Sequence, residues 1–172
     1  GWYDAPSGGN WITHGGGYTG AIYNDVTYYA HWSTKYYSII YNLEGGSWPA
    51  EALSSYIYEW QGPLSSVYYV PSPVKPGYTF VGWKGTSTDP NEPCTDSWAD
   101  DGKVHSQFIL SQGVIGSITL TAHWSAAQYT VSFNANGGSN APSSVQATYG
   151  QAMPALDRTP TWSGHTFYGW FA

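Results

Sequence analysis

Residues 77–83 read Gly-Tyr-Thr-Phe-Val-Gly-Trp, and a closely similar segment, Gly-His-Thr-Phe-Tyr-Gly-Trp, follows at residues 164–170, 87 positions later. A second segment, Ala-His-Trp-Ser, occurs at residues 30–33 and again at residues 122–125, 92 positions later. Segments that recur together at nearly one period indicate a tandem repeat. The chain is therefore expected to hold several copies of one structural unit.

The order of the recurring segments divides the chain into one complete and two partial units. A third segment, which ends in Gly-Gly, stands near the front of each unit at residues 42–46 and 134–138, and Ala-His-Trp stands at the back. We predict a complete unit at 34–125, the back half of a preceding unit at 1–33 and the front half of a following unit at 126–172. The absence of an initiating Met suggests a segment of a longer polypeptide.

Local patterns predict a mainly β protein with little helix. Residues 26–30, 117–121 and 129–133 alternate with period two and are rich in branched and aromatic side chains. The Gly-Gly pairs at 45–46 and 137–138 can adopt positive φ, which favours turns after the strands. Strands joined by such turns account for most of the pattern.

One segment has a competing helical pattern. Its apolar residues Leu53, Tyr56, Ile57 and Trp60 have the spacing of one helix face. The corresponding stretch of the next unit lacks this stripe, and a Gly-Pro pair at 62–63 would end a helix almost at once. We therefore predict a strand at 54–60.

Composition excludes several classes of protein. Aromatic residues make up 18% of the chain and charged residues 9%, which is the opposite of a disordered sequence. The net charge of −6 would repel a phosphate backbone, so no nucleic-acid partner is expected. No apolar run approaches the roughly 20 residues that cross a bilayer, so this segment is not expected to insert into a membrane. The single Cys94 cannot form an internal disulfide.

Candidate sites for metals and cofactors do not meet their chemical requirements, and we predict none. The insertion at 86–102 reads as a surface loop, and its Asp96, Asp100 and Asp101 lack the ligand spacing of an EF-hand. Residues 15–20 fit Gly-x-Gly-x-x-Gly, but a strand rather than a helix is predicted after them. The recurring histidines, His31 and His123, follow from the repetition alone.

Three of the segments together resemble one known family. Residues 129–138, 164–170 and 120–124 are similar to the motifs of the Listeria-Bacteroides repeat, also called the internalin B-repeat. The resemblance implies small β-grasp modules in tandem, in secreted or surface-attached bacterial proteins that use them as stalks, spacers or adhesion elements. It implies no catalytic site. The insertion at 86–102 and the expanded stretch at 47–74 depart from the family pattern.

The aromatic residues permit two interpretations. Phe80 with Trp83, and Phe167 with Trp170, occupy fixed places in the repeat and are predicted to supply core, with burial worth about 2 to 3 kcal/mol for each ring. Other tryptophans lie outside the repeated motifs and are candidates for a ligand platform, because sugars stack on exposed rings. These candidates are Trp11, Trp48, Trp60, Trp98 and Trp162.

Two functions follow from these interpretations. The first is a non-enzymatic repeat module at the bacterial cell surface or in the extracellular space, whose partners are neighbouring repeats or identical chains. No Gly-x-Ser-x-Gly or His-Glu-x-x-His motif is present, and the carboxylates do not recur between units as a catalytic pair would. The alternative is a carbohydrate-binding module that recognises host or surface glycans through exposed Trp and Tyr.

The two partial units have a further consequence. Residues 126–172 alone would leave strand edges unpaired and an apolar face uncovered, which proteins normally avoid. The missing back half is present at residues 1–33. We therefore expect the two halves to complete one module, either within one molecule or between successive molecules that form a head-to-tail filament.

Overall fold

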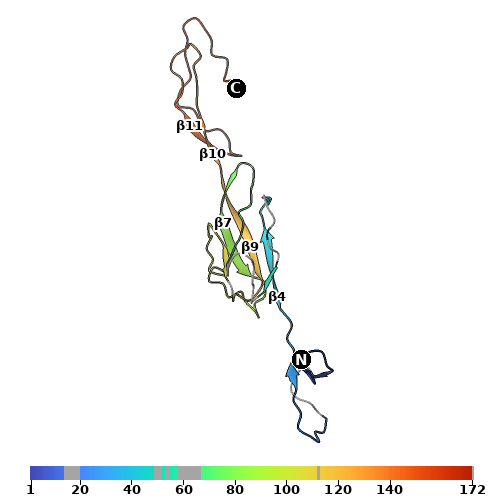
Figure 1. Cartoon of the computed structure of the whole chain (residues 1–172). Coiled ribbons are helices and arrows are strands. Elements are labelled where there is room, and N and C mark those ends of the chain that lie inside the picture. Colours follow the sequence, from blue (N-terminus) through green and yellow to red (C-terminus); the bar gives the residue numbers. More distant parts are fainter. Residues whose placement is uncertain (14–19, 49–51, 53–54, 58–66, 112, 172) are drawn as a thin grey trace. The chain divides into compact units, whose positions relative to one another are not determined.

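A computed structural model describes the chain except for residues 14–19, 49–51, 53–54, 58–66, 112 and 172 (Figure 1). The described residues form strands and loops without helix, so none of them provides a helix that could cross a membrane. This confirms the mainly β prediction. The chain divides into two compact units, Gly1–Tyr36 and Tyr37–Ala172.

The first unit contains a small antiparallel sheet. Its strands are β1 (Trp2–Tyr3), β2 (Trp11–Thr13) and β3 (Tyr29–Ala30), in the order β2-β1-β3. The strand predicted at 26–30 is confirmed only for its last two residues, because its partner β1 pairs through two residues alone.

The second unit is built around a four-stranded sheet of order β5-β4-β9-β7. Figure 1 shows β4, β7 and β9 side by side. The central pair, β4 and β9, is parallel, with Ile39 opposite Ile118, and β7 lies antiparallel on the other edge of β9. The strands of this sheet are β4 (Tyr36–Asn42), β5 (Ser55–Ile57), β7 (Tyr78–Ser87) and β9 (Ile118–Ala126). Three residues of the strand predicted at 54–60 are thus confirmed, and its other residues lie outside the described part of the chain.

Two further pairs complete the second unit. Strand β6 (Val67–Tyr69) pairs with β8 (Ile109–Ser111), and β10 (Gln128–Val131) pairs with β11 (Val145–Thr148), both antiparallel. The last pair lies within residues 126–172, which are predicted to be the front half of the following repeat. The strand predicted at 129–133 is therefore present as far as Val131.

The core of the complete repeat surrounds Trp83, whose exposed fraction is 0%. Its ring lies near those of Tyr41, Trp48 and Phe80, with centroid distances of 5.3 to 5.7 Å. The fully buried side chains of Phe108, Ile118 and Leu120 extend this core. The prediction that this recurring tryptophan is a core residue is confirmed in the complete repeat.

The insertion at 86–102 is not a wholly exposed loop, so that prediction is corrected. Cys94 is buried in the core, and Trp98 packs against it with its ring centroid 5.9 Å from that of Phe108. Asp100 accepts hydrogen bonds from the backbone N and the hydroxyl of Ser87. The insertion therefore contributes apolar side chains to the core of the complete repeat.

The front half at the C-terminal end repeats the backbone conformation of the complete unit. Its Gly164 and Gly169 have φ of 76° and 153°, against 76° and 154° at the equivalent Gly77 and Gly82. An antiparallel bridge between Ser139 and Thr161 likewise repeats the bridge between Ser47 and Val74. The half repeat therefore matches the complete one at these two glycines and at this bridge.

The same half repeat does not bury its aromatic residues. Phe167 and Trp170 are 42% and 36% exposed, and the segment that carries them is not a strand, although the equivalent segment forms β7. The core role predicted for these two rings is therefore wrong. The reason is that β7 pairs with β9, and residues 128–171 contain no strand equivalent to β9.

Candidate binding surface

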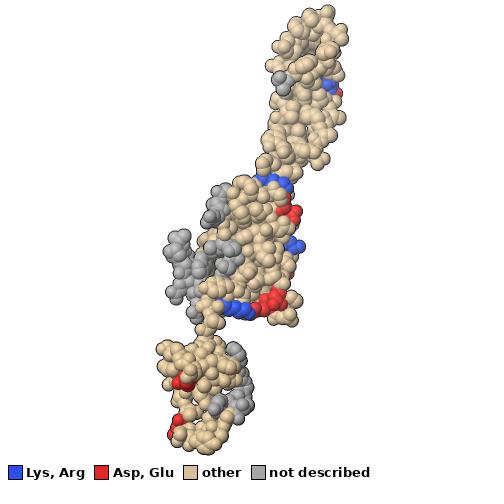
Figure 2. All heavy atoms as spheres, turned by 90° about the vertical axis from the view of Figure 1, so that its right-hand side faces the viewer, with Lys and Arg blue, Asp and Glu red and all other residues tan. Residues whose placement is uncertain are grey.

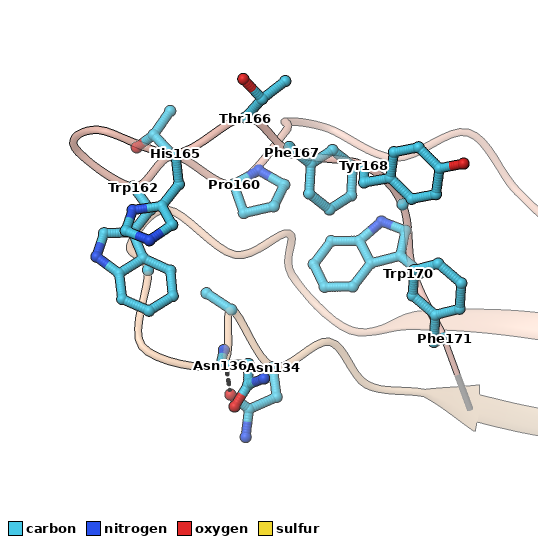
Figure 3. Close-up of a pocket in the computed structure, with 14 residues that line it drawn as sticks. Asn134, Asn136, Pro160, Trp162, His165, Thr166, Phe167, Tyr168, Trp170 and Phe171 are labelled. Atoms are coloured by element: carbon cyan, nitrogen blue, oxygen red, sulfur yellow. Dashed lines mark hydrogen bonds between the residues drawn. The ribbon is translucent and has the colours of Figure 1, made fainter.

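The exposed rings line a cleft in the C-terminal half repeat, with a volume of about 390 Å³. One wall is the turn at residues 134–138, and the other is the segment at 160–171. Figure 3 shows Phe167, Tyr168, Trp170 and Phe171 gathered toward one end. The cleft is therefore open, and aromatic rings and polar groups line it in similar measure.

Ring contacts hold the walls of the cleft in place. Trp170 lies between Phe133 and Phe167, at centroid distances of 5.0 and 5.2 Å. At the other end, Trp162 stacks on His165 with centroids 4.2 Å apart. The rings are arranged before any partner binds, which lowers the conformational entropy that binding must overcome.

The surroundings of the cleft carry little charge. Asp157 and Arg158 are the only Asp, Glu, Lys or Arg residues between positions 128 and 172, and they form an ion pair of 2.7 Å. The hydrogen bond from Arg158 lowers the pKa of Asp157 below its usual value. Figure 2 shows this part of the surface as almost entirely uncharged. The cleft therefore suits an apolar or aromatic partner better than an ionic one.

The equivalent position in the complete repeat is occupied. The Trp124 side chain, from β9, lies there with its ring centroid 5.4 Å from that of Phe80, and its Nε1 donates a 3.0 Å hydrogen bond to the Leu43 carbonyl. Gly46 gives the ring room, because a Cβ at that position would lie 2.5 Å from it. The corresponding residues of the half repeat are Phe167, Ala135 and Gly138.

The rim of the cleft also has a counterpart in the complete repeat. There, Lys75 places its Nζ 4.4 Å from the Tyr78 ring centroid, and Trp162 with His165 holds the same two positions in the half repeat. The exposed Trp162 therefore belongs to the rim of the cleft and not to the place that Trp124 fills.

The structure places the predicted platform tryptophans in different settings. Trp48 and Trp98 pack against the core of the complete repeat, whereas Trp11, in the first unit, and Trp162 are each about half exposed. Trp60 lies outside the described residues. Sequence reasoning did not identify Phe167, Tyr168, Trp170 and Phe171 as binding residues. The signal that could have found them was that their unit lacks a following Ala-His-Trp segment within 128–172.

The remaining polar candidates are held by local contacts. His31 stacks on Tyr3 at 3.9 Å and its Nε2 lies 2.8 Å from the Ala5 carbonyl. Asp101 lies 2.9 Å from Nε2 of His105. No cluster of three or more His, Cys, Asp or Glu residues with the arrangement of a metal site occurs in the part of the chain that the structure describes. Residues 15–19 of the glycine-rich string lie outside that part.

The carboxylates of the insertion differ in their environment. Burial raises the pKa of Asp96 above its usual value, although its carboxylate accepts a 2.8 Å hydrogen bond from the backbone N of Trp98. The pKa of Asp101 is lowered, chiefly by a hydrogen bond from the backbone N of Lys103 and also by His105. Both carboxylates therefore accept hydrogen bonds from backbone N–H groups of their own loop.

These features define a class: a tandem β-repeat protein with an aromatic core in its complete unit and an open aromatic cleft in its partial one. The chain belongs to the Listeria-Bacteroides repeat domain family, whose model matches residues 37–123 and 129–172. This confirms the resemblance inferred from the recurring segments.

Two relatives come from Evansella cellulosilytica. One, provisionally named a membrane protein, is 32% identical over 152 residues. The match covers 87% of this chain and 19% of the relative. The other, provisionally named a Gly-rich membrane protein, is 33% identical over 147 residues, with coverage of 85% and 14%. The chain thus spans less than a fifth of the relatives it matches. No solved structure matches it.

Proposed function

We propose that the chain is a non-enzymatic spacer segment of a bacterial cell-surface protein, in which successive repeats hold a distal part away from the cell or contribute to adhesion. The observation that carries this proposal is the direct contact between successive repeats. Only Ala127 separates β9 of the complete repeat from β10 of the next one. A spacer needs such short connections, because a long flexible linker would let each repeat move independently.

The contact at this junction is specific. The backbone N of Ala127 donates to the Gly77 carbonyl at 2.9 Å, and the Ala127 carbonyl accepts from the N of Tyr149 at 2.8 Å. The Tyr149 ring lies 5.5 Å from the Tyr78 ring, and a Cβ at Gly77 would lie 2.3 Å from Tyr149. Gly77 thus allows the next repeat to pack closely on the end of β7.

The relatives support a surface location at a coarse level, since both are provisionally named membrane proteins and both are much longer than this chain. A repeat that serves as a spacer would occupy a small share of such a protein. Its function would depend on its length and stiffness, with no need for a catalytic group.

Spin labels on two exposed positions, Asn91→Cys and Gln151→Cys, test the spacer proposal, because Cys94 is buried and stays unlabelled. We expect a narrow distance distribution between the labels by pulsed electron spin resonance. Tyr149→Ala should broaden it, whereas Tyr129→Ala, which removes an exposed ring outside the junction, should not. A broad distribution in the unaltered chain would contradict the spacer function.

A carbohydrate-binding function is the second candidate, favoured by the half-exposed Trp162 stacked on His165 at the rim of an uncharged aromatic cleft. Such rings offer flat apolar faces that complement sugar rings. Affinity electrophoresis in gels that contain cell-wall or host polysaccharides would test it. Retardation that Trp162→Ala removes and Tyr129→Ala, which removes an exposed ring outside the cleft, leaves unchanged would support it, and unretarded migration in every gel would contradict it.

A further inference from the structure

We propose that a groove in the complete repeat binds an acidic sugar, such as a uronic acid within a polysaccharide, with the sugar ring against aromatic side chains and its carboxylate on Lys75. The groove has a volume of about 430 Å³, within the range of roughly 300 to 1,000 Å³ that ligand sites have. It shares no lining residue with the cleft near Trp162. The inference goes beyond the spacer function and does not depend on it.

The walls of the groove are mainly aromatic and apolar. Tyr78 and Phe80 supply rings from β7, and Trp124 supplies one from β9. Tyr78 is 36% exposed, and the other two side chains are partly buried. A sugar ring has an apolar C–H face that packs against such rings. The groove therefore offers a stacking surface of about the size of a sugar unit.

Lys75 places a cation at the rim of the groove. Its Nζ lies 4.4 Å from the Tyr78 ring centroid and 5.8 Å from that of Trp124. It donates a 2.7 Å hydrogen bond to the Glu44 carbonyl, which leaves two of its three N–H donors for other partners. Among the described residues, no Asp or Glu side chain forms an ion pair with it. A carboxylate that enters the groove therefore meets an ammonium group that no side chain neutralises.

A tight turn fixes this cation beside its ring. Lys75 and Tyr78 are the first and last residues of the turn, which a 3.1 Å hydrogen bond from the Tyr78 N to the Lys75 carbonyl closes. Pro76 and Gly77 stand between them, and the φ of 76° at Gly77 is that of a type II turn. The Pro76 ring restricts the backbone further. The rim is therefore arranged before a ligand binds, which lowers the conformational entropy that binding must overcome.

Further contacts fix the remaining walls. Trp124 donates a 3.0 Å hydrogen bond from its Nε1 to the Leu43 carbonyl, and its ring lies 5.4 Å from that of Phe80. Ser47 and Val74 exchange two backbone hydrogen bonds of 2.8 Å. Ser47 is exposed and lines the groove, so its hydroxyl is available to donate to or accept from a sugar hydroxyl.

The combination of rings and one cation favours an acidic sugar over simpler ligands. An inorganic anion would pair with Lys75 and leave the aromatic faces unused, whereas a neutral sugar would use the rings alone. A quaternary amine, which aromatic rings also bind, would be repelled by the Lys75 ammonium. A ligand with both an apolar face and a carboxylate uses every group that the groove presents.

A matched pair of ligands tests this assignment. Tri-galacturonate carries carboxylates, and its methyl ester keeps the sugar rings without the charges. By calorimetry, the acid should bind at least about tenfold more tightly than the ester, because hydrogen bonds to charged groups are roughly twice as strong as neutral ones. The NMR signal of the Trp124 indole N–H, identified by its absence in Trp124→Phe, should shift on binding. Equal affinities for acid and ester, or no binding at millimolar concentration, would overturn the proposal.

Lysine variants locate the binding site. Lys75→Gln should weaken the binding of tri-galacturonate at least about tenfold, and Lys75→Arg should retain most of it. Lys103→Gln, which removes an exposed lysine outside the groove, should have no effect. Equal losses from the two glutamine variants would show nonspecific attraction and overturn the proposal, and equal affinity for benzoate would assign the groove to aromatic acids instead. The spin labels test the spacer function separately, so failure here would leave that result unaffected.

Discussion

The Trp124 ring, on β9 in the back half of the repeat, lies 5.4 Å from the Phe80 ring, on β7 in its front half. This pair joins the two ends of the repeating sequence into one core. Where the chain supplies only the front half, as at residues 128–171, the equivalent Phe167 is exposed. The burial of the phenylalanine in this motif therefore depends on its contact with the tryptophan of the paired strand.

Trp83→Ala should destabilise the complete repeat by about 3 to 5 kcal/mol, because the substitution leaves a large cavity at a side chain that is wholly buried. Thermal or urea unfolding of the second unit would measure this change. The matched variant Trp170→Ala, at the equivalent but exposed position, should change stability by less than about 1 kcal/mol. Equal losses in the two variants would show that the C-terminal half repeat buries its aromatic residues in solution.

Gly77→Ala should destabilise the junction more than Gly164→Ala does. Both glycines have a φ of 76°, so both substitutions carry the same backbone strain of roughly 1 kcal/mol. A Cβ at Gly77 would also collide with the Tyr149 ring, whereas nothing lies within 4 Å of a Cβ at Gly164. Hydrogen exchange of the β10 and β11 amides should therefore accelerate in Gly77→Ala alone.

A double variant provides the check on this interpretation. Adding Tyr149→Ala to Gly77→Ala removes the collision and should recover part of the lost protection, because the two positions are coupled through direct contact. Additive effects would mean that Tyr149 does not pack on Gly77 in solution.

The repeat architecture could be read from the sequence because the recurring segments mark structurally equivalent positions. Glu44 and Asn136 illustrate this, with φ of 49° and 50° in turns of different sequence. The exposure of Phe167 could not be predicted in the same way, because its motif is the same as the motif whose rings are buried in the complete repeat. Burial of Trp83 depends on β9, which is distant in sequence, and the motif itself carries no record of whether that strand is present.

The insertion shows a second limit of sequence reasoning. Its composition, with four Asp residues between 86 and 102, indicated a solvated loop. Cys94 and Trp98 nevertheless reach the core, because isolated apolar residues in a polar segment give no periodic signal and are recognised only through the contacts they make.

The carboxylates Asp96 and Asp101 should affect stability in opposite directions as the pH changes. The pKa of Asp101 is lowered, so its stabilising contribution is present above its usual pKa of 3.8 and is lost as the pH falls through the folded-state value. The pKa of Asp96 is raised, so its charged form destabilises the fold above the raised value, and this penalty disappears at lower pH.

Asparagine substitutions separate these two effects. Asp96→Asn keeps an acceptor for the backbone N of Trp98 and removes the charge, so it should stabilise the protein at pH 7 and lose this advantage below pH 3.8. Asp101→Asn should destabilise it at pH 7 and have little effect in strong acid. Urea unfolding at a series of pH values would measure both, and effects of the same sign at pH 7 would contradict the assignment.

Trp124→Ala and Trp32→Ala should differ sharply in a single chain, although the two residues occupy the same position of the repeat. Trp124 contacts Phe80 and donates to the Leu43 carbonyl, so its removal should cost about 2 to 4 kcal/mol and leave a cleft in the complete repeat. Trp32 is 91% exposed, so its removal should change stability by less than about 0.5 kcal/mol under dilute conditions. Urea unfolding at low micromolar concentration would compare them. A large loss from Trp32→Ala in dilute solution would mean that this ring is already buried within its own chain.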